Sequence, residues 1–189
     1  LGTTDLNDIT IITFDNSGAN SSHFVGQEIV AGERGDITLT VEGTITVNSA
    51  TPLSGDEGRF VSRGAVTLNA SLNTLYLDTE AHGDVTITQS ARMILTIERL
   101  TVFNGSLAIT ADGSVDLADV RLATEANGSD RTVLVDTTSA ITGGDIYVRS
   151  VAFGNYVEDG GNLYLLVAQK DSNGDSVFDA DGVLQTERL

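Results

Sequence analysis

Twelve residues near the end of the chain, DSNGDSVFDADG from Asp171 to Gly182, concentrate oxygen-bearing side chains. Calcium is a hard cation that binds six to eight oxygens, and a loop that returns carboxylates at alternate positions can surround it. Without a cation, the carboxylates would repel one another. The segment therefore predicts a Ca²⁺ site, with a solvated acidic loop as the alternative. The predicted ligands are Asp171, Asn173, Asp175, the carbonyl of Val177, Asp179 and Asp181.

The second half of this loop departs from the EF-hand pattern. Ser176 stands at position 6 where that pattern has glycine, and Gly182 stands at position 12 where a bidentate glutamate belongs. The preceding residues, GNLYLLVAQK, alternate like a strand and not like an incoming helix. The segment resembles the calcium loops of dockerins and thrombospondin type 3 repeats, which occur outside helix pairs. That resemblance implies a loop that rigidifies a junction and not a calcium sensor.

The sequence contains few candidate catalytic residues. His23 and His82 are far apart and have no Ser, Cys or metal-ligand spacing around them, and a lone histidine is more often a surface residue than a base. Asp112, Asp116 and Asp119 form an acidic group that the overall charge already explains. We therefore predict that the protein is not an enzyme, with a carbohydrate-active β-helix enzyme as an alternative.

Charge and composition limit the classes of partner. The 189 residues include 27 acidic and 10 basic side chains, and the net charge of −17 would repel the phosphates of a nucleic acid. No run of about 18 apolar residues could span a membrane, and no signal peptide is recognisable. The absence of cysteine excludes disulfides and leaves the compartment open. We therefore expect neither a nucleic-acid partner nor a membrane span.

Apolar and polar residues alternate with the period of β-strands along most of the chain. The clearest case is DITLTVEGTITV, in which five apolar side chains fall on one parity: Ile37, Leu39, Val41, Ile45 and Val47. The composition is rich in Val, Ile, Leu and Thr, with 20 glycines and one proline, which favours strands joined by tight turns. The sequence therefore predicts an all-β protein.

Glycines precede many of these strands at intervals that suggest a repeat. They are Gly35, Gly64, Gly83, Gly105, Gly144 and Gly161, separated by 29, 19, 22, 39 and 17 residues. If the longest step spans two turns, the unit is about 20 residues, which predicts a β-solenoid with about seven turns between Gly35 and Lys170. We expect the glycines to supply positive φ at the turns. The alternative is a pair of tandem antiparallel β-sandwiches.

Three of these segments carry a resemblance to a known family: GDITLTVEGTITV, GDVTITQSARMILTI and GSLAITADGSVDLADVRL. They resemble the coil repeats of filamentous-haemagglutinin-like exoproteins and other large bacterial surface proteins, over residues 35 to about 168. The resemblance implies a right-handed parallel β-helix with an extracellular or cell-surface role in adhesion or in building a filament.

These observations predict three segments with different roles. Residues 1–34 form a cap, an extra coil or a donated strand, residues 35–168 form the solenoid body, and residues 169–189 form the calcium loop and junction. We expect a structural or adhesive module of a secreted surface protein or filament. Its expected partners are further copies of itself or adjoining modules, joined end to end through unpaired strand edges, with cell-surface carbohydrate as a further candidate.

Threonine pairs suggest one more alternative, an ice-binding solenoid. The pairs are Thr38 with Thr40, Thr44 with Thr46, and Thr86 with Thr88. An ice-binding face needs many threonines in register on one flat surface, whereas an outward threonine is also a favourable strand residue. The sequence therefore favours threonine as a strand former here.

Overall fold

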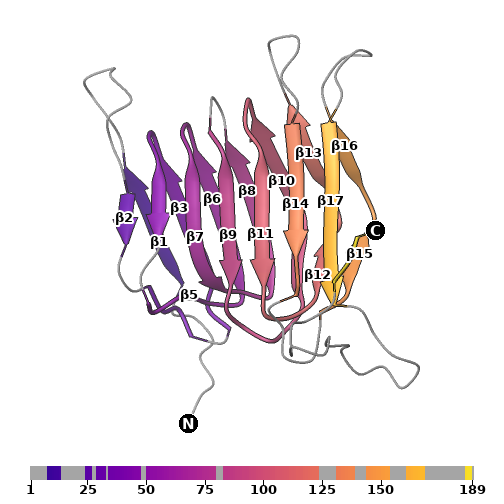
Figure 1. Cartoon of the computed structure of the whole chain (residues 1–189). Coiled ribbons are helices and arrows are strands. Elements are labelled where there is room, and N and C mark those ends of the chain that lie inside the picture. Colours follow the sequence, from indigo (N-terminus) through magenta and orange to yellow (C-terminus); the bar gives the residue numbers. More distant parts are fainter. Residues whose placement is uncertain are drawn as a thin grey trace.

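The computed structural model describes residues 8–13, 24–26, 29–32, 34–47, 50–79, 83–123, 131–138, 144–153, 161–168 and 186–188. These residues form strands and turns without a helix, which confirms the all-β prediction. The strands build two sheets of nine strands each, and Figure 1 shows the sheets lying face to face.

Each sheet is a stack of short strands along the length of the molecule (Figure 1). Sheet A consists, in spatial order, of β1 (Ile9–Thr13), β3 (Ile37–Val41), β6 (Glu57–Ser62), β8 (Thr74–Thr79), β10 (Leu95–Phe103), then β12 (Val115–Leu117) with β13 (Val120–Ala123), and β15 (Ile146–Val148) with β16 (Val151–Phe153). Sheet B consists of β2 (Phe24–Gly26), β4 (Ile45–Val47), β7 (Val66–Ser71), β9 (Val85–Gln89), β11 (Leu107–Ala111), β14 (Arg131–Asp136), β17 (Gly161–Ala168) and β18 (Thr186–Arg188), with β5 (Leu53–Ser54) beside β7.

Up to β17 the chain alternates between the two sheets, so a strand pairs with one that follows after the chain has passed through the opposite sheet. All pairings between the named strands are parallel except that of β17 with β18. The alternative of antiparallel sandwiches is therefore wrong for the described strands. The sequence separation between residues in a parallel pair varies from 17 positions, as for Gly58 and Leu75, to 31 positions, as for Leu117 and Val148.

Inward side chains from both sheets form the core between them. The five apolar residues of DITLTVEGTITV are each at most 2% exposed, as their common parity predicts. In sheet A, one column of paired inward positions runs through Ile9, Ile37, Gly58, Leu75, Ile97, Leu117 and Val148. Each fully buried Ile or Leu contributes about 2 kcal/mol relative to an exposed one. Stacking like side chains on like is therefore the main source of stability.

Polar residues in the core bond to the backbone where the chain changes sheet. Gln89 is fully buried, and its amide donates to the carbonyl of Leu72 at 2.6 Å and accepts from the Leu72 N–H at 3.2 Å. Ser62 donates its hydroxyl to the carbonyl of Gly43 at 2.7 Å. These side chains satisfy backbone groups that the sheet ladders do not reach, which removes the cost of burying them unpaired.

The strand-start glycines are needed for close packing and mostly not for positive φ. A Cβ on Gly105 would lie 2.2 Å from the carbonyl oxygen of Gly83, and one on Gly144 would lie 2.1 Å from that of Gly113. Among the described glycines, only Gly32 and Gly83 have positive φ, at 86° and 153°. Our expectation of positive φ at these turns is therefore wrong for most of them. The backbone of the preceding layer occupies the space that a side chain would need.

The glycine spacing also overstated the number of turns. Gly105 precedes β11 in sheet B, whereas Gly144 precedes β15 in sheet A, so the 39-residue step does not join equivalent positions. The residues before Gly35 instead contribute β1 and β2, which pair with β3 and β4. Sheet A therefore contains seven layers, of which β1 is the first.

Replacing Gly105 by alanine should destabilise the protein by about 3 kcal/mol, because the new methyl group must displace the backbone of Gly83. Urea denaturation followed by circular dichroism measures the free energy of unfolding. Gly26→Ala is the matched control, since its Cβ would meet the movable ring of Phe24 at 2.9 Å and not a backbone atom. Equal losses in the two variants would contradict the close-packing explanation.

Candidate functional site

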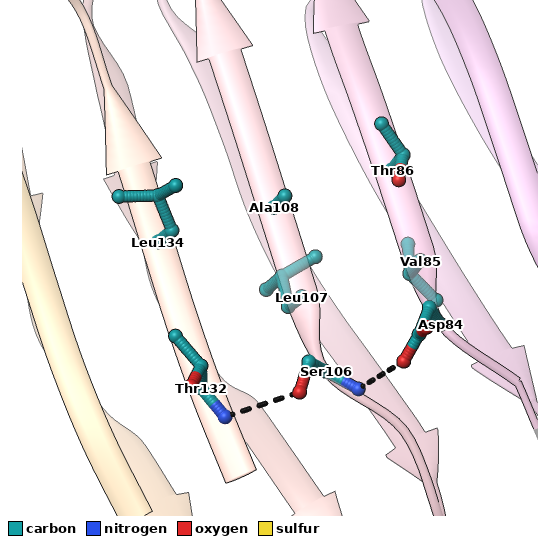
Figure 2. Close-up of a pocket in the computed structure, with 8 residues that line it drawn as sticks. All are labelled: Asp84, Val85, Thr86, Ser106, Leu107, Ala108, Thr132 and Leu134. Carbon is teal, nitrogen blue, oxygen red and sulfur yellow. Dashed lines mark hydrogen bonds between the residues drawn. The ribbon is translucent and has the colours of Figure 1, made fainter.

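A depression on the outer face of sheet B is the first candidate binding feature. It has a volume of about 230 Å³, opens to solvent and crosses the beginnings of β9, β11 and β14. Figure 2 shows Thr86, Ala108 and Leu134 side by side along it, so the small Ala108 forms the low point between two larger side chains. Below them, Ser106 Oγ accepts a hydrogen bond from the Thr132 N–H at 3.2 Å, and Asp84 accepts one from the Ser106 N–H at 2.9 Å.

The chemistry of this depression is that of a contact surface. Among its eight lining residues, Asp84 is the one titratable group, and its carboxylate already accepts a hydrogen bond from the Ser106 N–H. Its volume is below the range of about 300–1,000 Å³ that is usual for small-molecule sites. The depression has room for one side chain of a partner or one sugar ring. Its backbone donors are already occupied by Asp84 and Ser106.

A β-bulge shapes the outer face of sheet A. The register between β8 and β10 shifts between Ile97 and Arg99, which leaves Glu98 as the extra residue. In the next layer Ala118 and Asp119 both direct their N–H groups to the carbonyl of Ile97. Bulges bend a strand and turn its side chains in a new direction. Exposed charged residues lie on or beside β10, β12 and the segment that joins β15 to β16: Glu98, Arg99, Asp119 and Arg149.

Two arginines on this face have defined partners. Arg59 forms an ion pair with Glu57 and lies over the ring of Tyr76, 4.1 Å from its centroid. Arg149 binds both carboxylate oxygens of Asp116, with its Nε donating at 2.9 Å to one of them. The bidentate bond to Asp116 raises the pKa of Arg149 above its ordinary value. These pairs are exposed, so they contribute little to stability and mainly fix the positions of the side chains.

The pairing of Arg59 with Tyr76 could not be predicted from the sequence, because the residues are 17 positions apart and meet only through the register of β6 with β8. No local motif connects them.

The threonine pairs of the ice-binding alternative are divided between the two sheets. Thr38 and Thr40 lie in sheet A, and Thr86 and Thr88 lie in sheet B, so the pairs do not form one array. On sheet B, three threonines, Thr46, Thr67 and Thr86, do lie in one row, which then continues into Ala108 and Leu134.

The predicted calcium ligands, from Asp171 to Asp181, lie outside the described residues, as do His23 and His82. Within the described part of the chain, no three His, Asp or Glu side chains are grouped so that they could hold a metal ion. Asp116 is paired with Arg149, and Asp119 is exposed between β12 and β13. Asp112, Asp116 and Asp119 are therefore not grouped as metal ligands in this structure, and the calcium loop stays a prediction.

Comparisons with known proteins identify no relative of this chain. No family model, curated protein or solved structure matches the chain. The described residues also contain no helix long and apolar enough to cross a membrane. The class that the fold defines is an all-β protein of two stacked sheets of parallel strands. Its function has to be argued from its own residues.

Tyr147 on β15 should titrate above the ordinary tyrosine pKa. The negative charge of Asp145, which also accepts a hydrogen bond from the Tyr147 hydroxyl at 3.3 Å, raises the pKa of Tyr147 by disfavouring the phenolate. Absorbance near 295 nm, followed against pH for the protein and for Tyr147→Phe, isolates this titration among the four tyrosines. Asp145→Asn should lower the pKa of Tyr147. An unchanged midpoint in Asp145→Asn would contradict the assignment.

Proposed function

We propose that this chain is a right-handed parallel β-helix that serves as a structural or adhesive module of a secreted cell-surface protein or extracellular filament. The observation that carries the proposal is the regular return of the chain to the next position of the same sheet. Up to β17, each return passes through the opposite sheet and ends in a parallel pairing. Crossover connections between parallel strands are right-handed in about 98% of cases, which supports the proposed hand.

A stack of this kind suits a mechanical role. Seven layers of sheet A at about 4.8 Å each extend on the order of 30 Å, and every layer is bonded to its neighbours along the axis. Repeat architectures of stacked layers provide extended surfaces and can be lengthened by adding layers. The outer faces carry isolated ion pairs and a shallow depression, which suit contacts with a partner better than catalysis. Cell-surface carbohydrate stays the proposed class of adhesion ligand.

Calcium is the proposed stabiliser of the C-terminal junction. The acidic segment from Asp171 to Gly182 follows β17, the last parallel strand of sheet B. A net charge of −17 also favours binding of divalent cations, and extracellular fluids supply calcium at concentrations that suit weak oxygen-ligand sites. In this proposal, Asp171, Asn173, Asp175, Val177, Asp179 and Asp181 supply oxygens to Ca²⁺, so that the loop stiffens the connection to the following module.

Removal of calcium should lower the melting temperature, because a ligand that binds only the folded state stabilises it by mass action. Differential scanning calorimetry with 2 mM free calcium, which is roughly 2- to 20-fold above the dissociation constants of about 10⁻⁴–10⁻³ M usual for extracellular sites, should show a loss of about 1–7 °C on chelation. Asp175→Asn should reduce this loss. Asp119→Asn, which removes an exposed carboxylate between β12 and β13, should leave it unchanged. A melting temperature that does not respond to chelation would refute the calcium proposal.

A further inference from the structure

The two ends of sheet A present strand edges that no other described strand covers. β1 pairs only with β3, and at the opposite end β15 and β16 pair only with β12 and β13. In sheet B, by contrast, β18 runs antiparallel along the last three residues of β17. An open edge offers a row of backbone donors and acceptors to another strand. Sheet A is therefore the sheet through which the stack can be extended at its C-terminal end.

Exposed apolar side chains gather at the same two ends. Among the described residues, seven large hydrophobic side chains are exposed, and three of them lie on the outermost strands of sheet A: Ile12 at 52%, Tyr147 at 48% and Val148 at 43%. Val148 ends the inward column in which Leu117 and Ile97 are fully buried. The side chain of Val148 is thus exposed because no further described strand covers it, and not because it points outward from the sheet. A further layer would bury it as the earlier members of the column are buried.

The hydrogen-bond ladder of sheet A has a direction that makes its two edges complementary. Inward residues donate their N–H to the following strand, as Ile9 does to Asp36 at 2.9 Å, Leu100 to Asp119 at 2.8 Å and Val120 to Ser150 at 3.0 Å. Backbone groups of successive residues point to opposite sides of a strand, as the pleat requires. The free groups at the C-terminal edge therefore belong to the inward residues of β15 and β16, which include Val148 and Val151.

At the N-terminal edge, the free groups belong to the outward residues of β1. Ile9 is bonded toward β3, so the N–H and C=O of Thr10 and Ile12 point away from β3. A parallel strand that pairs with β15 and β16 must point the backbone N–H and C=O groups of its outward residues toward these two strands. The outward residues of β1 have free N–H and C=O groups that can do so. The two edges of one molecule thus have the hydrogen-bonding pattern of neighbouring layers.

We propose that the C-terminal edge of sheet A binds β1 of a second copy of this chain in parallel register, with Ile9 against Val148 and Ile11 against Val151. The inward columns then continue across the junction. Val148 and Val151 are three positions apart in the sequence, whereas Ile9 and Ile11 are two positions apart. The same mismatch occurs inside the molecule, where Leu75 and Leu77 pair with Ile97 and Leu100. This inference rests on the proposed structural module and names the contact by which copies join.

A head-to-tail contact of this kind does not close on itself. Each added copy presents the same free edge as the one before, so association produces open chains of increasing length and not a dimer. The net charge of −17 on every copy opposes the contact. Salt screens that repulsion, and we therefore expect association to strengthen between low ionic strength and about 0.15 M.

Sedimentation velocity over a 100-fold range of protein concentration, in calcium and salt, tests the contact. The wild-type mass should rise with concentration beyond that of a dimer. Val148→Lys places a charge at the end of the core column, and Thr10→Pro removes an amide proton that β3 does not use, so each should leave a monomer. Val61→Lys, a change on the outer face of β6 in the middle of sheet A, is the matched control and should associate like the wild type.

Mixing the two end variants gives the sharpest result. Val148→Lys keeps an intact β1, and Thr10→Pro keeps an intact C-terminal edge, so an equimolar mixture should form one-to-one dimers and nothing longer. Val151→Pro, which removes the amide proton of Val151 at the C-terminal edge, is a second variant that should behave like Val148→Lys. Circular dichroism confirms that each variant is folded.

Three outcomes would overturn the contact. They are a wild-type protein that stays monomeric, a wild-type mass that stops at a dimer, and a mixture of the end variants that stays monomeric. Any of these, in a protein whose melting temperature still responds to calcium, leaves the calcium-stabilised module in place and removes only the head-to-tail contact. If the protein forms long chains but its melting temperature does not respond to calcium, the calcium proposal is refuted and the head-to-tail contact is retained.

Discussion

The parallel, in-register pairing of each strand with its equivalent in the next layer is the constraint on which the rest of this structure depends. Because the register is kept, an inward side chain always lies against inward side chains of the adjacent layers. The pairs of Leu39 with Phe60 and of Val66 with Val85 are examples. The apolar columns, the uniform direction of the hydrogen bonds and the complementary edges all follow from this one geometric rule. A shift of one residue would turn every inward side chain toward solvent.

The same constraint explains the glycines and the buried polar side chains at the corners. Layers separated by about 4.8 Å leave no room for a Cβ where two corners stack, which is why Gly83 and Gly105 adjoin. Where a corner does not stack so closely, a side chain completes the backbone hydrogen bonds, as Gln89 does for Leu72. Corners are thus built either by removing side chains or by using them as hydrogen-bonding groups.

The outer faces are less constrained than the core, and this is where function can be placed. The bulge at Glu98 and the small Ala108 change the surface locally, while inward side chains on both sides of the bulge still pair with inward side chains. The ends of the stack differ from the faces, because there the core itself is interrupted. An architecture that grows by repetition must either cover its last layer or share it with another molecule, and in sheet A the described strands leave that layer uncovered.

The sequence by itself determined the local properties of this protein. Alternation of apolar and polar residues identified the strands and their buried parity, as in Ile37, Leu39 and Val41, because the period of two is a property of the extended chain. The charge indicated an acidic surface, and the acidic segment after β17 predicted a calcium loop that lies outside the described residues. Glycine spacing alone suggested a repeat of about 20 residues, whereas residues in parallel pairs of the structure are separated by between 17 and 31 positions.

Only the tertiary structure decided which strands pair. Gly105 and Gly144 look equivalent in the sequence, yet they begin strands in opposite sheets, because the loops between layers vary in length while the register does not. The contact of Arg59 with Tyr76, the bulge at Glu98 and the open edge at β15 likewise depend on pairings between distant segments. Local sequence carries the preference of a residue for a face of its strand. The partner of that strand is chosen by the combined burial of the whole column, which no single segment contains.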